Sequence, residues 1–111
     1  MSDVVELASS ALYKAIDLHA EGNYLAISDV HDAVDVPLFE ATQTLEHSQL
    51  TTNLKLVRSF LDGWADSSNH NWQYYDGISR DDWPLLAEQL VESLKSNSEH
   101  TSKAVLENFS V

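Results

Sequence analysis

The sequence predicts a small, mainly α-helical domain with room for a short β-hairpin. Apolar residues recur at three- and four-residue spacing through most of the chain, which is typical of helices that pack on one side. The chain has 111 residues, of which 43% are hydrophobic, and this is enough for one domain with its own core. It contains no cysteine, which excludes disulfides and thiolate zinc sites. We therefore expect a single domain over residues 1–111.

The first helix is the clearest element of the sequence. Its apolar residues form a single stripe, and Gly22 follows as a natural stop because glycine tolerates the left-handed backbone that ends many helices. The residues of the stripe are Val4, Leu7, Ala8, Ala11, Leu12, Ala15 and Ile16.

Two further helices are expected in the next segment. The first is short, begins with Ser28 as its cap, and breaks at Asp35–Val36 because the residue before a proline avoids helical angles. Pro37 suits the first turn of the second, which should run to about Ser48. The side chains expected to face inward from it are Leu38, Phe39, Ala41 and Leu45.

Residues 54–64 fit two structures. Apolar residues at helical steps favour a helix, whereas Leu54-Lys55-Leu56 alternates as a short strand does. After them comes a helix over Trp83–Lys95, which Asp81 or Asp82 would cap and whose first turn accommodates Pro84. The tail, residues 96–111, suggests a last helix with frayed ends.

All three tryptophans lie between residues 62 and 83. Trp64 and Trp83 occupy helical core positions, so we expect both to be buried. Trp72, Tyr74 and Tyr75 fit either a strand packed on the core or a surface that binds a partner, since aromatic residues are enriched at interface hot spots. The Asp76-Gly77 pair that follows is a strong turn signal.

Residues 27–50, ISDVHDAVDVPLFEATQTLEHSQL, resemble a helix-turn-helix. With the first helix they resemble the three-helix core of a winged-helix domain. That resemblance implies wing strands at 54–58 and 72–75, and a closing helix at 83–95. It also implies that the helix Pro37–Ser48 would read the DNA major groove. The turn departs from the family pattern, because Asp35 stands where a glycine is common.

The charge of the chain contradicts DNA reading. There are 18 acids and 6 Lys or Arg, for a net charge of −12. The 40 residues between Lys14 and Lys55 carry seven acids and no Lys or Arg. Each phosphate contact needs a donor, and DNA affinity follows the number of phosphates neutralised. A DNA-binding role would depend on Lys55, Arg58 and Arg80 converging on one surface.

No catalytic, nucleotide-binding or metal motif is present. His31 and Asp35 are four residues apart and would share a helix face, but one helix supplies only two such ligands. We therefore expect no enzyme activity, no cofactor and no metal site, with a small metal-dependent enzyme as the most distant alternative.

The surface chemistry predicts a protein-interaction module. An acidic surface attracts a basic partner, such as a nuclease or a DNA-binding protein, which the chain would regulate or inhibit. The candidate contact residues are Asp29, Asp32, Glu40, Glu46, Trp72, Tyr74, Tyr75 and Asp76. Binding to nucleic acid or membrane is not expected, and the lack of an apolar span predicts a cytoplasmic protein. A winged-helix transcription regulator is the alternative.

Overall fold

A computed structural model describes residues 3–46, 48–75, 77–98 and 103–109. The helices are α1 (Asp3–Ala20), α2 (Ile27–Thr44), α3 (Gln49–Asn69), α4 (Trp83–Ser96) and α5 (Lys103–Phe109), with short 3-10 turns at Tyr24–Ala26 and Arg80–Asp82. Two short strands, β1 (Tyr74–Tyr75) and β2 (Ile78–Ser79), pair antiparallel as a hairpin. The prediction of a mainly helical fold with a short hairpin is confirmed. None of the described helices combines the length and the apolar character that crossing a membrane requires.

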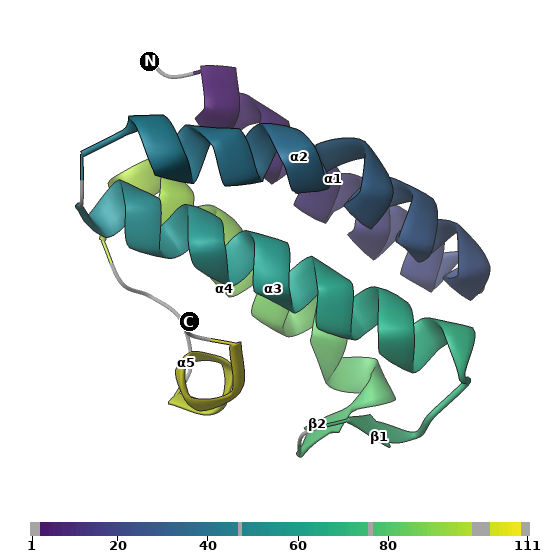
Figure 1. Ribbon diagram of the computed structural model, residues 1–111. Helices are drawn as coiled ribbons and strands as arrows, with labels where there is room; N and C mark the ends of the chain where they lie inside the picture. The colour runs from purple at the N-terminus through teal and green to yellow at the C-terminus, as the bar shows by residue number, and fades with distance from the viewer. Residues whose placement is uncertain (1–2, 47, 76, 99–102, 110–111) are drawn as a thin grey trace.

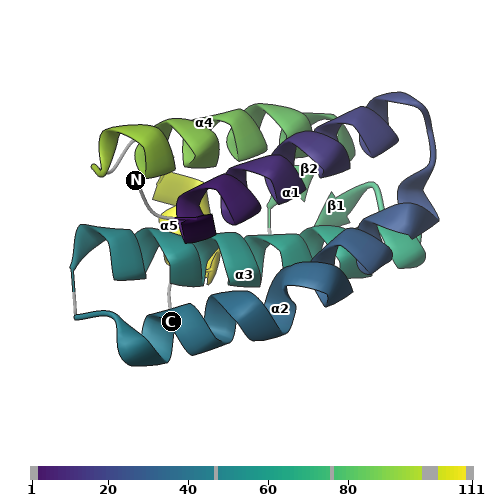
Figure 2. The ribbon, with the colours of Figure 1, turned by 90° about the horizontal axis from the view of Figure 1, so that it is seen from above.

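Helices α1 to α4 form a bundle in which the chain runs up, down, up and down (Figure 1). Helix α1 packs between α2 and α4, and α3 contacts the same two helices from the other layer, as the view from above shows (Figure 2). Helix α5 packs against α3 on the side away from α2 (Figure 1). The core is thus shared by four long helices rather than the expected three.

Aromatic side chains fill one half of the core. Trp64 and Trp83 are 0% and 1% exposed, as predicted, and their rings stack with centroids 6.0 Å apart. Phe60 meets both tryptophans, and Phe109 from α5 closes the cluster with its centroid 5.7 Å from that of Phe60. Such ring pairs stabilise a core beyond the area they bury. The predicted last helix is therefore present and docked as Lys103–Phe109, and the predicted fraying concerns residues outside the described ones.

The predicted break at Asp35–Val36 is wrong. Helix α2 is continuous for 18 residues, starts one residue before Ser28 and contains Pro37 in its interior. An interior proline removes a hydrogen bond and costs about 3 kcal/mol. Val34 and Leu38 are 5% and 0% exposed on either side of it. Burial of two such side chains contributes roughly 3–6 kcal/mol, so continuous packing outweighs the local preference.

The connection after α2 also differs from the expectation. The helix ends at Thr44 rather than Ser48, and Ser48 instead caps α3 by accepting a hydrogen bond from the amide of Thr51 at 3.4 Å. Leu45, expected to face inward, is 39% exposed. The segment that resembles a helix-turn-helix is therefore one long helix followed by the start of another.

The predicted wing strand at 54–58 is wrong as well. These residues belong to α3, and the helical alternative for 54–64 is confirmed. Within the described residues the hairpin pairs Tyr74 with Ser79 and Tyr75 with Ile78, so its second strand follows the aromatic residues in the chain.

Helix α4 begins at Trp83, as predicted, with Asp82 at the cap position but without a side-chain capping bond.

His19 links α1 to the aromatic core. Its Nδ1 accepts a hydrogen bond from the indole N–H of Trp64 at 3.3 Å. Burial lowers the pKa of His19 below its ordinary value of 6.5, an effect that the carboxylate of Asp81 opposes and the guanidinium of Arg80 reinforces. The neutral form is the one that fits this site, because a protonated Nδ1 no longer accepts the bond.

This arrangement predicts a pH-dependent stability. The unfolded chain takes up a proton at His19 below about pH 6.5, where the folded chain resists protonation, so the stability present above that pH is lost as the pH falls. We expect the difference in unfolding free energy between the wild type and His19→Gln to shrink from about pH 7.5 to about pH 5. Denaturant unfolding of both proteins measures it. Because the comparison cancels the titration of the other groups, an unchanged difference would contradict the assignment.

Candidate functional site

The outward surface of α2 carries three of the predicted contact acids. Asp29, Asp32 and Glu40 are exposed, and with Val36 they follow one another at spacings of three, four and four residues. This spacing aligns them as a single stripe along the helix. We call these four residues the acidic face of α2. Glu46, the fourth predicted acid, is also exposed but lies in the connection beyond the end of the helix.

Two exposed apolar side chains accompany these acids, and the sequence analysis missed both. Val36 is 59% exposed and lies within the stripe, whereas Phe39 is 44% exposed on the side that faces α3. Phe39 had been expected to face inward. Carboxylates interspersed with exposed apolar groups are a surface on which a protein partner gains apolar contact as well as charge. The helical spacing of Asp29, Asp32, Val36 and Glu40 would have revealed the stripe if α2 had been recognised as one helix.

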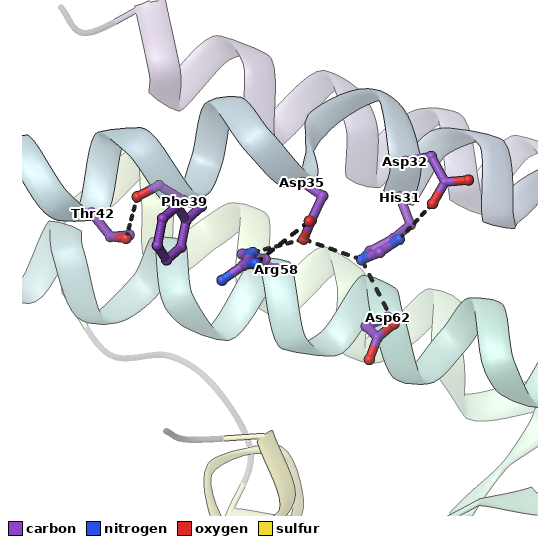
Figure 3. Close-up of polar contacts among 7 residues, drawn as sticks. All are labelled: His31, Asp32, Asp35, Phe39, Thr42, Arg58 and Asp62. Atoms are coloured by element: carbon purple, nitrogen blue, oxygen red, sulfur yellow. Dashed lines mark hydrogen bonds and ion pairs between the residues drawn. The ribbon is translucent and has the colours of Figure 1, made fainter.

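A polar cluster occupies the seam between α2 and α3 (Figure 3). Arg58 of α3 donates from Nε to Asp35 of α2 at 2.7 Å, and its Nη2 reaches the other carboxylate oxygen at 3.4 Å. This bonding to Arg58, together with its charge, holds the pKa of Asp35 below its ordinary value despite the partial burial that opposes the effect. The guanidinium carbon of Arg58 also lies 4.8 Å from the centre of the Phe39 ring.

His31 lies among three carboxylates in the same cluster. Its ring nitrogens are 3.1 Å from Asp32, 3.4 Å from Asp35 and 3.7 Å from Asp62 (Figure 3). A groove of about 390 Å³ opens here, and Lys55 and Ser59 also line it. The predicted proximity of His31 and Asp35 is confirmed, but Asp35 is already bound by Arg58. Throughout the described part of the chain, no group of three or more His, Asp or Glu side chains is arranged to hold a metal ion.

The three bases on which a DNA-binding role would depend do not converge. Lys55 lies near the start of α3, whereas Arg80 donates to the carbonyl of Asn71 just beyond the end of that helix. At 1.5 Å per residue, α3 separates these two positions by more than about 20 Å. Arg58 lies between them but is engaged with Asp35. Lys55 and Arg58 therefore line the same groove, where Arg58 is bound to Asp35, and Arg80 lies apart from both.

The predicted aromatic contacts divide between surface and core. Tyr74 and Trp72 are 69% and 43% exposed, and Trp72 lies flat on His70 with ring centroids 4.4 Å apart. Tyr75 is partly buried and packs on Trp83. Asp76 lies outside the described residues. The hairpin lies on the opposite side of α3 from α2 (Figure 1), so the acids and the aromatic residues form two separate surfaces.

Comparison of the chain with protein-family models, with curated proteins and with solved structures finds no match.

Proposed function

We propose that this chain is a non-enzymatic protein-interaction module that regulates or inhibits a partner with a basic surface. The observation that carries the proposal is the acidic face of α2, where exposed carboxylates surround the exposed Val36 and where the helix supplies no Lys or Arg. Its field attracts a basic partner over a distance of about 10 Å at moderate salt and repels nucleic acid. Apolar contact at Val36 then adds a short-range contribution to the free energy of binding that charge alone does not provide.

The partner of such a module would present Lys or Arg around an apolar patch. Nucleases and DNA-binding proteins carry basic surfaces of this kind, because they must contact phosphates. Covering that surface with α2 would block access of the nucleic acid, which is how binding becomes inhibition. Trp72 and Tyr74 are a second candidate contact surface on the opposite side of the molecule, and they act in the same interaction only if the partner reaches around α3.

Charge reversal on α2 tests the proposal. Partners are captured from a lysate of the native cell, purified and titrated calorimetrically. The variant carries Asp29→Lys, Asp32→Lys, Glu40→Lys and Glu46→Lys. Exposed ion pairs each contribute about 0.2–1 kcal/mol, and reversal replaces attraction with repulsion, so we expect Kd to rise at least about 10-fold.

The matched control reverses four exposed acids away from α2. Asp82→Lys, Glu88→Lys, Glu92→Lys and Glu107→Lys produce the same net charge, and these side chains lie on or beside α4 and α5. We expect the control to weaken binding much less than the α2 variant. Equal affinity of the wild type and the α2 variant for the purified partner would remove the proposal. A specific, salt-sensitive complex of the wild type with duplex DNA in a gel shift would favour the transcription regulator instead.

A further inference from the structure

Two adjoining hollows run along the seam between α1 and α2. One has a volume of about 300 Å³ and lies between Leu7, Ala11 and Leu18 of α1 and Val30 and Ala33 of α2. The other has a volume of about 590 Å³ and continues toward the start of α1 and the end of α2, where Val4 faces Pro37 and Ala41. Leu7 lines both hollows, so they form one continuous depression, which we call the α1–α2 groove.

The groove has an apolar floor and a mainly acidic rim. Leu7 remains 37% exposed within it, although it belongs to the apolar stripe of α1. Asp29 and Glu40, two residues of the acidic face, line the groove on the α2 side, and Asp3 lines it on the α1 side. Among the described residues that line it, Lys14 is the one Lys or Arg. An occupant with a basic border and an apolar centre complements this distribution.

We infer that the α1–α2 groove binds an amphipathic helix of the partner, with apolar side chains in the groove and Lys or Arg along its flanks. From Asp3 to Leu18 the groove follows α1 for about 22 Å, which matches a helix of about 15 residues. A helix laid in such a groove anchors itself through apolar residues at positions i, i+3, i+4 and i+7. The inference rests on the proposed function, because it names the element through which a basic partner would meet α2.

A second copy of this chain fits the groove less well. At a net charge of −12, two copies repel each other, and the rim of the groove adds further negative charge at the contact. The same negative charges attract a basic helix and so strengthen its binding.

A synthetic peptide tests the inference in solution. The probe has about 15 residues, with Leu at the i, i+3, i+4 and i+7 positions and Lys elsewhere, and its control is a scrambled peptide of the same composition. Each is titrated into the ¹⁵N-labelled chain at near-physiological salt, and amide chemical shifts are followed. We expect saturable shifts in α1 and α2 around Leu7, Ala11, Val30 and Ala33, with the scrambled peptide binding at least about 10-fold more weakly.

Filling the groove provides the decisive variant. Ala33 is exposed on the groove wall, so Ala33→Trp occupies the site without entering the core. Ala20 is also exposed on α1 but does not line the groove, and Ala20→Trp is the matched control. We expect Ala33→Trp to raise the Kd of the peptide at least about 10-fold and Ala20→Trp to leave it within about 2-fold.

Three other outcomes would overturn the inference. Equal binding of the two peptides would reduce the interaction to charge alone, and shifts centred on Trp72 and Tyr74 would move the site to the hairpin. A wild-type dimer that Ala33→Trp converts to a monomer in sedimentation would make the occupant a second copy. Binding of the native partner to the α2 charge variant and to Ala33→Trp distinguishes failure of this inference from failure of the proposed function. Binding that depends on the α2 charges but not on Ala33 removes only the helix in the groove, whereas binding independent of those charges removes both.

Discussion

Replacing Trp64 with alanine is expected to lower the free energy of unfolding by about 3–5 kcal/mol. The side chain is fully buried, stacks on Trp83 and meets the edge of Phe60 with centroids 5.8 Å apart. Truncation also removes the indole N–H that donates to His19. The loss thus combines a cavity, several ring contacts and one hydrogen bond. Denaturant unfolding followed by circular dichroism measures it, and Trp64→Phe provides a milder variant should the alanine variant not fold.

Trp72→Ala is the matched control for this prediction. Trp72 comes from the same aromatic segment, but it is 43% exposed and its nearest ring partner is His70 on the surface. We expect its loss to cost less than about 1 kcal/mol. Similar losses at the two positions would contradict the division of this segment into a buried part and a surface part.

Gly63→Ala is expected to destabilise the protein by about 1–3 kcal/mol, although alanine is normally the better helix former by about 1 kcal/mol. A Cβ built on Gly63 lies 2.5 Å from Cε1 of Phe109 and 3.3 Å from Cε1 of Tyr75. Phe109 is 3% exposed and wedged among the core aromatics, so its ring has little space to move. The added methyl group therefore forces α5 away from α3. Thermal or denaturant unfolding of the variant measures the change.

A second substitution isolates this cause. Phe109→Leu removes the ring atoms nearest to Gly63, so Gly63→Ala in that background should be neutral or stabilising. The change of sign between the two backgrounds is the expected result. If Gly63→Ala stabilises the otherwise unaltered chain, the close packing of α5 on α3 is wrong.

Much of the fold follows from local patterns in the sequence. The apolar stripe of α1 and the positive φ of 78° at Gly22, just after it, agree with the expectation, as does the start of α4 beside Pro84. Burial of Trp64 and Trp83 also follows from their spacing. Pro37 led to the wrong prediction of a helix break. The free-energy cost of an interior proline is local, whereas the packing of Val34 and Leu38 that outweighs it depends on α1 and α3. The one local sign of continuity is the helical spacing of Ile27, Val30, Val34 and Leu38, which runs across the proline.

The candidate site was predictable only in part. The exposure of Asp29, Asp32 and Glu40 follows from their charge, because an ionised side chain is rarely buried without a partner. Their alignment with Val36 could be predicted only if α2 was recognised as one continuous helix. The ion pair between Asp35 and Arg58 joins residues 23 positions apart, and the α1–α2 groove depends on how two helices splay. Neither feature has a signature in the sequence, because each is fixed by tertiary packing.

Carboxylate footprinting of the complex tests the central claim most directly, namely that the acidic face of α2 contacts the partner. Free chain and purified complex are treated with a carbodiimide and an amine, and the labelled residues are identified by mass spectrometry. We predict that Asp29, Asp32 and Glu40 lose most of their labelling in the complex, while the exposed Glu88 and Glu92 on α4 keep theirs. Protection of Glu88 and Glu92 with unchanged labelling on α2 would contradict the account.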